Sequence, residues 1–244
     1  MILLNQLQTG KNNNMEKLIA YKLMKNKLCV FFENEGYNFS IDIDGIEMSM
    51  VKDFGKIMSG FQIVKSVSQK EENYLTVGIR VNDFVFNIRH DIVEDICYKF
   101  NNNFDENTLP HNGITIGSSY GKVTGKKYFS IGEAYTEEEV ENICNLIKSI
   151  YTNNLKSCIE RYSNLKLLER DFNMDTENEL PFSPIYWRGR RSMRGLILAK
   201  LCNNPRYEEL KIIYRQKCIE QEDADVLEAY DKLAYYLDHE FEKT

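Results

Sequence analysis

The spacing of apolar residues changes from a helical period to a strand period and back along this chain. Residues 16–35 carry apolar side chains every three or four positions, which predicts a helix that stops at Gly36. From Phe39 to Met50 apolar and polar residues alternate around Asp44-Gly45, which predicts a β-hairpin with a two-residue turn. Similar alternation predicts further strands, with turns at 70–73 and 82–83, over residues 61–68, 74–81, 84–88, 114–118 and 127–131.

Helical spacing returns in the remaining segments. A short helix is expected over residues 91–100, and Thr136-x-x-Glu139 has the form of a capping box that opens a long helix with an apolar stripe as far as Tyr162. The polar residues 171–179 predict a linker. Beyond it the pattern is entirely helical, with a break at residues 203–205.

These elements predict an α+β fold: an antiparallel β-sheet flanked by helices, followed by an all-helical C-terminal subdomain. We expect three parts, namely a disordered polar leader at 1–14, an α+β domain at 15–170 and the helical subdomain at 180–244. Because Met15 directly follows the asparagine-rich end of the leader, translation could start at Met1 or at Met15.

Composition narrows the class of protein. The chain of 244 residues is 43% hydrophobic and has a net charge of −6, which is typical of a folded, soluble protein. No apolar run approaches the roughly 20 residues of a membrane span, and none of the six cysteines forms a C-x-x-C pair. We therefore expect a cytoplasmic protein with reduced thiols, no membrane partner, no cofactor and no metal.

Two motifs resemble catalytic ones but lack essential parts. The glycine-rich segment 117–127 departs from the phosphate-binding loop, because its first two glycines are one residue too close and Val123 stands where a hydroxyl is needed. His90-Asp91 would need further histidines for a metal site, and only His111 and His239 are present. The sequence therefore predicts no catalytic residue and makes an enzyme the less favoured class.

The strongest signal is a pair of oppositely charged blocks. Residues 187–217 hold nine basic and two acidic residues, whereas residues 218–244 hold nine acidic and two basic ones. Arginine and tryptophan are common interface anchors. The sequence therefore offers one candidate partner-binding set, which consists of Trp187, Arg188, Arg190, Arg191 and Arg194.

Three interpretations of this set stay open. The arginines could pair with the acidic last helix, bind a protein with an acidic surface, or bind nucleic acid or a phosphorylated ligand. Nucleic acid is the least favoured, because few aromatic residues lie among the basic ones and the rest of the chain is acidic.

The order of elements in residues 15–162 resembles the bacterial type III secretion chaperone fold. The features that carry this resemblance are Asp44-Gly45 in the first hairpin, the short helix that ends at residues 101–103, and Thr136 to Val140 at the start of the last helix. Members of that family are small acidic proteins, often dimeric, that hold a segment of another protein. The resemblance thus implies protein binding without catalysis, and it leaves a homodimer open.

We therefore expect a non-enzymatic cytoplasmic protein of a bacterial type, acting as a chaperone, an adaptor or a toxin-neutralising immunity protein. The alternatives are an enzyme or binder for a phosphorylated or nucleotide ligand clamped by the arginines of 188–194, and a nucleic-acid-binding protein.

Overall fold

The computed structural model describes most of the chain in eight stretches. They comprise residues 22–41, 47–53, 57–69, 77–100, 114–119, 131–134, 136–176 and 190–241. The expected leader at 1–14 lies outside these residues. The chain is α+β and its C-terminal part is helical, as the sequence predicted.

A six-stranded sheet contains the strands in the order β1-β2-β3-β4-β5, with β6 paired to β4. The first pair confirms the expected hairpin strands, since they are antiparallel with Asn38 opposite Val51 and Ile41 opposite Met48. The predicted turn at Asp44-Gly45 falls outside the described residues. The strands are β1 (Asn38–Ile41), β2 (Glu47–Asp53), β3 (Ile57–Gln69), β4 (Val77–His90), β5 (Ile116–Ser119) and β6 (Gly132–Ala134).

One sequence-based prediction within the sheet is wrong. Instead of two strands with a turn at residues 82–83, β4 runs without interruption for 14 residues. β4 pairs antiparallel with β6 from Ile79 to Val81, immediately before the expected turn, and it also neighbours β3 and β5. Hydrogen bonds to neighbouring strands can outweigh the local turn preference of an Asn-Asp pair.

The chain divides into two compact units. The first comprises residues 1–52, 60–86 and 119–157, and the second comprises residues 53–59, 87–118 and 158–244. This division differs from the expected boundary between 170 and 180, because α2 (Asp91–Phe100) contacts the C-terminal helices α7 (Arg190–Leu201) and α9 (Ala224–His239).

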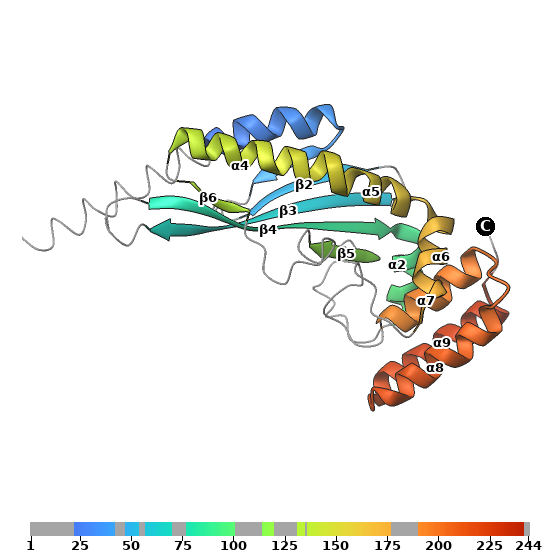
Figure 1. The fold of residues 1–244 in the computed structure, drawn as a ribbon. Helices are drawn as coiled ribbons and strands as arrows, with labels where there is room; N and C mark the ends of the chain where they lie inside the picture. Colours follow the sequence, from blue (N-terminus) through green and yellow to red (C-terminus); the bar gives the residue numbers. More distant parts are fainter. Residues whose placement is uncertain are drawn as a thin grey trace, which may run out of the picture. The chain divides into compact units, whose positions relative to one another are not determined.

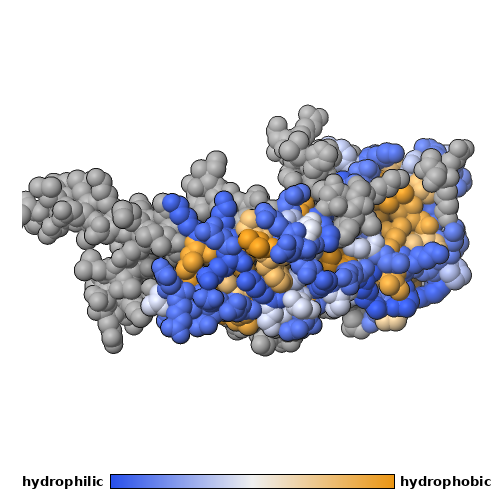
Figure 2. Space-filling view, turned by 90° about the horizontal axis from the view of Figure 1, so that it is seen from above, coloured by the Kyte–Doolittle hydropathy of each residue, from blue (hydrophilic) through white to orange (hydrophobic). Residues whose placement is uncertain are grey.

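In the first unit, two helices cover one face of the sheet (Figure 1). Residues 22–34 bury Met24, Leu28 and Phe32, and α4 (Glu137–Ile150) buries its own apolar stripe. Lys27 pairs with Glu141 of α4 at 3.1 Å. Viewed from above, the surface in Figure 2 is mainly polar, with apolar residues in separate groups.

The predicted capping box at the start of α4 is confirmed. The Thr136 hydroxyl accepts a hydrogen bond from the backbone N–H of Glu139, and the Glu139 carboxylate accepts one from the backbone N–H of Thr136. Two of the N–H groups that a helix leaves unpaired at its start are thereby satisfied. The sequence pattern thus located this helix start correctly.

The long helix contains a π turn, η2 (Tyr151–Leu155), before it continues as α5 (Lys156–Ser163). The Lys156 N–H donates to the Tyr151 carbonyl, so residues five apart stack on each other. Both side chains therefore reach Glu35 Oε2, Lys156 Nζ at 2.7 Å and the Tyr151 hydroxyl at 3.3 Å. The hydrogen bond from Lys156 is the main reason that the pKa of Glu35 is lowered.

A further helix replaces part of the expected linker. Asn164 caps α6 (Leu165–Met174) by accepting from the N–H groups of Lys166 and Leu167. The prediction of a linker from residue 171 is thus wrong for residues 171–174. Phe172 and Asn173 are buried, and this packing stabilises the last turn of α6 in spite of its polar sequence.

The second unit is built around α7. This helix is buried on all sides from Ser192 to Ala199, and it contacts α2, α6, α9 and α8 (Tyr207–Glu220). A helix that is apolar around its circumference belongs in a core. The break predicted at residues 203–205 is confirmed, since α7 ends at Leu201 and α8 begins at Tyr207.

Helices α7 and α8 approach each other closely where Gly195 faces Tyr214. A Cβ atom on Gly195 would lie 2.5 Å from the ring of Tyr214, although alanine is otherwise the better helix former by about 1 kcal/mol. We expect Gly195→Ala to lower the free energy of unfolding by about 1–3 kcal/mol, and Gly195→Val to lower it further. Urea denaturation followed by circular dichroism measures both. A Gly195→Ala protein that is more stable than the wild type would contradict the close contact.

Candidate functional site

The structure describes the side chains of two of the five residues in the predicted binding set, Arg191 and Arg194. Trp187 and Arg188 lie outside the described residues, and only the backbone of Arg190 is described. Arg191 and Arg194 belong to α7 and are directed into the second unit rather than toward a partner. The expected continuous Arg/Trp surface is therefore not present at these last two positions.

Arg194 is the clearest correction, because its side chain is wholly buried. Its Nε donates to Glu94 Oε1 at 2.8 Å, and its Nη2 donates to Glu94 Oε2. A buried charge requires a partner with which it shares hydrogen bonds. The sequence suggested the acidic last helix as the internal partner, but Glu94 lies in α2, 100 residues earlier in the chain.

Arg191 is also engaged within the second unit. Its Nη2 donates to the backbone carbonyl of Asp175, and its guanidinium lies 5.9 Å from the centre of the Phe172 ring. Arg191 thereby joins the first turn of α7 to the end of α6. Two of the four arginines proposed as a phosphate clamp thus have intramolecular partners.

The two charged blocks do meet, but through other residues. Lys211 of α8 forms an ion pair with Asp238 of α9 at 2.8 Å. The Nε and Nη2 atoms of Arg215 donate to the two carboxylate oxygens of Asp231 at 2.8 and 2.9 Å. Each exposed pair contributes only about 0–1 kcal/mol. These pairs link α8 to α9, and they neutralise part of the positive charge of residues 187–217.

The histidine and cysteine motifs have structural roles where the structure describes them. His90 is buried, and its Nε2 donates to the Tyr162 carbonyl at 2.8 Å. None of the six cysteines is part of a disulfide bond, and burial raises the pKa of three of them, Cys144, Cys158 and Cys218, to about 11. Within the described stretches, no His, Cys, Asp and Glu side chains group together in a way that could hold a metal ion. His111 and residues 120–127 of the glycine-rich segment lie outside those stretches.

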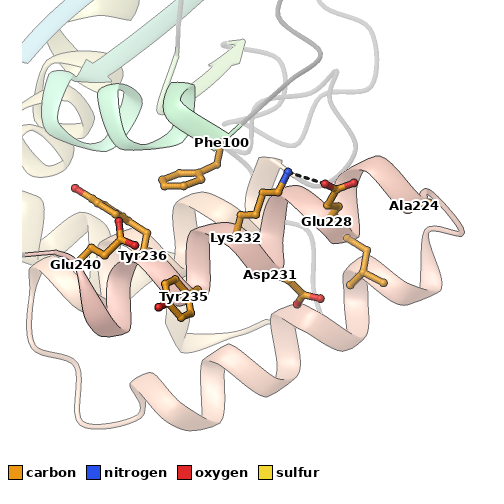
Figure 3. Close-up of a pocket in the computed structure, with 9 residues that line it drawn as sticks. Phe100, Ala224, Glu228, Asp231, Lys232, Tyr235, Tyr236 and Glu240 are labelled. Carbon is orange, nitrogen blue, oxygen red and sulfur yellow. Dashed lines mark ion pairs between the residues drawn. The ribbon is translucent and has the colours of Figure 1, made fainter.

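An open groove of about 670 Å³ lies in the second unit, between the end of α2 and one face of α9 (Figure 3). Three aromatic residues contribute to it, Phe100 from α2 and Tyr235 and Tyr236 from α9. Its charged residues all come from α9 and its C-terminal end. The remaining lining residues are Ala224, Leu227, Glu228, Asp231, Lys232 and Glu240.

The aromatic residues of the groove differ in exposure and in support. The ring of Tyr236 is held between its neighbours, with Phe100 at 5.1 Å, Phe241 at 6.0 Å and Lys99 Nζ at 5.3 Å from its centre. Tyr235 is 60% exposed, and its ring lies 4.6 Å from that of His239. The groove therefore combines a fixed aromatic wall with a large accessible aromatic side chain.

In the sequence, this segment stands out only as an acidic partner for the basic block. Tyr235 and Tyr236 lie outside the buried face of α9, which holds Ala229, Tyr230, Leu233 and Leu237. Large aromatic residues on the polar side of an amphipathic helix were the signal that could have indicated a surface site. The contribution of Phe100 depends on the contact between α2 and α9, which local spacing does not reveal.

No protein-family model matches this chain, and the searches of curated proteins and of solved structures give no match either. In the part of the chain that the structure describes, no helix has both the length and the apolar character needed to cross a membrane.

Replacing Arg194 should be far more damaging than replacing a surface arginine. Arg194→Met would leave Glu94 buried without its cation, and we expect a loss of about 3–5 kcal/mol in the free energy of unfolding. The double variant Glu94→Leu/Arg194→Met should recover much of that loss, because it removes both charges. Arg215→Met is the matched control and should lose about 0–1 kcal/mol. Equal losses for the two single arginine variants, measured by urea denaturation, would contradict the buried pair.

Acidification should destabilise the protein through His90. Burial lowers the pKa of His90 below its ordinary value of 6.5, although the nearby carboxylates of Glu94 and Asp91 partly oppose this shift. As the pH falls through 6.5, His90 binds a proton in the unfolded chain but stays neutral in the folded one. The free energy of unfolding therefore decreases by up to about 1.4 kcal/mol per pH unit. Comparing urea midpoints at pH 8 and pH 5.5, we expect His90→Gln to lose less stability on acidification than the wild type. Identical losses would be evidence against this residue as the origin.

Proposed function

We propose that this chain is a non-enzymatic protein-binding protein and that the groove between α2 and α9 is its binding surface. The observation that carries the proposal is the exposed aromatic side of α9, where Tyr235 stands 60% accessible beside the fixed ring of Tyr236. Tyrosine provides a large contact area with little loss of side-chain freedom, and it is enriched among the residues that dominate interface energies.

The form of the groove supports binding to a protein more than to a small molecule. It is open along a helix rather than closed around a cavity, and its residues come mainly from a single element, α9. Small-molecule sites usually enclose most of the ligand surface. An elongated groove beside a helix suits a segment of another protein.

The resemblance of residues 15–162 to type III secretion chaperones implies the same kind of activity. A chaperone, an adaptor and an immunity protein all bind a partner without changing it chemically. Arg191 and Arg194 are no longer part of the proposed surface, because their contacts lie within the chain. Trp187, Arg188 and Arg190 stay candidate contacts of the same protein.

Site-specific photocrosslinking in the native host tests the proposal. A benzophenone amino acid at position 235 should give a covalent adduct with a defined host protein. Apart from the crosslink, mass spectrometry should find the peptides of that host protein unmodified, because the proposed function is binding without catalysis. The same amino acid at position 212 is the control, because Ile212 is 71% exposed on α8 but lies outside the groove. No adduct at position 235, or the same adducts at both positions, would contradict binding in the groove.

A further inference from the structure

The residues of α9 that line the groove recur with helical spacing. They occupy positions 224, 227, 228, 231, 232, 235 and 236, which form one face of the helix. The opposite face, with Ala229, Tyr230, Leu233 and Leu237, is buried. From Ala224 to Tyr236 the open face extends about 18 Å, given a rise of about 1.5 Å per residue. A segment of similar length can lie along it.

The side chains that line this face are of two kinds, apolar or aromatic ones and acidic ones. Leu227, Tyr235, Tyr236 and Phe100 provide the apolar contacts, and Glu228, Asp231 and Glu240 provide carboxylates. Lys232 is the single basic residue among those that line the groove, and its Nζ lies 2.6 Å from Glu228 Oε1. The lining residues thus carry three negative charges and one positive charge.

The surroundings increase this negative charge. Residues 218–244 contain nine acidic and two basic residues, and the cations of α8 that pair with them are Lys211 and Arg215, bound to Asp238 and Asp231. Arg194, which the sequence suggested could balance the acidic block, is buried against Glu94. Lys99, whose Nζ lies 5.3 Å from the centre of the Tyr236 ring, adds one further cation. The nine acidic residues of 218–244 still outnumber all of these cations, so the net charge around the groove is negative.

We propose that the groove binds a cationic amphipathic helix of a partner protein, an inference that rests on the proposed function of the groove. Apolar side chains on one face of that helix pack against Tyr235, Tyr236 and Leu227, as in other helix-in-groove complexes. Its lysine or arginine side chains lie beside Glu228 and Glu240. One of these cations can also cover the exposed ring of Tyr235, an arrangement that is favourable by about 0.5–1 kcal/mol at an exposed site.

This occupant differs from the one that the sequence suggested. Binding of an acidic partner requires the arginines of α7 to lie on the surface, but Arg191 and Arg194 have their partners inside the chain. A second copy of this chain is also disfavoured at the groove. A symmetric dimer would bring the acidic face of α9 against itself, and juxtaposed like charges oppose association. The phosphates of nucleic acid meet the same repulsion.

Binding of designed peptides tests the inference directly. The probe is a fluorescein-labelled helical peptide of about 14 residues, with leucines at helical spacing on one face and lysines elsewhere. One comparison peptide has glutamate in place of each lysine, and a second has the original composition in scrambled order, without an apolar face. Fluorescence anisotropy should show binding of the first peptide that is about tenfold or more tighter than that of either comparison, and that weakens with added salt.

Variants of the protein locate the binding. Tyr235→Ala and Glu240→Lys should each weaken the cationic peptide about tenfold, whereas Glu160→Lys should leave its affinity unchanged. Glu160 is a matched control because it is an exposed glutamate on α5, outside the groove. Thermal unfolding should confirm that the variants stay folded. Equal affinity for the charge-inverted or scrambled peptide, or equal affinity of Tyr235→Ala and wild type, would overturn the inference.

The crosslinking experiment keeps the two proposals separate. If the host protein joined to position 235 carries the crosslink in a segment with basic residues around an apolar helical face, the inference is supported. If the crosslinked segment is acidic or has no such face, the inference is overturned while protein binding by the groove stands. Absence of any adduct at position 235 counts against the function itself.

Discussion

The second unit depends on one buried ion pair, because α7 carries a full positive charge into the apolar core. Arg194 has no access to water, so α7 can occupy its place only if Glu94 is brought against it. That requirement links α2 to a helix that follows about a hundred residues later. It also explains why the compact unit combines residues 87–118 with the C-terminal helices, rather than the C-terminal helices alone. The groove exists because the same α2 ends beside α9 and places Phe100 there.

Local patterns predicted the elements whose causes are local. The capping box at Thr136, the hairpin strands around residues 44–45 and the helix from Asp91 each depend on neighbours within a few residues, and all three were located correctly. The turn expected at 82–83 and the linker expected at 171–174 were wrong, because distant partners stabilise those backbones. Spacing along a chain contains no information about such partners.

The candidate site illustrates the same limit for charge. Four arginines close together suggested a surface patch, since an arginine is usually solvated. Arg194 is instead enclosed, and the surface charge near the C-terminus is set by the carboxylates of α9 that stay outside. For this reason the partner that we propose is cationic, whereas the sequence favours an acidic one. A count of charges in the sequence was correct, but only the structure shows which of them reach the solvent.

The π turn at Tyr151–Leu155 takes up one residue more than an α-helix would place in that turn. An extra residue in a continuous α-helix would rotate everything beyond it by about 100°, whereas a π turn absorbs that residue and keeps the faces before and after it in register. Loss of one residue within the π turn would therefore restore an ordinary α-helix without rotating α5. Among relatives of this chain, a difference of one residue in length should be tolerated more readily at 151–155 than elsewhere in α4 or α5.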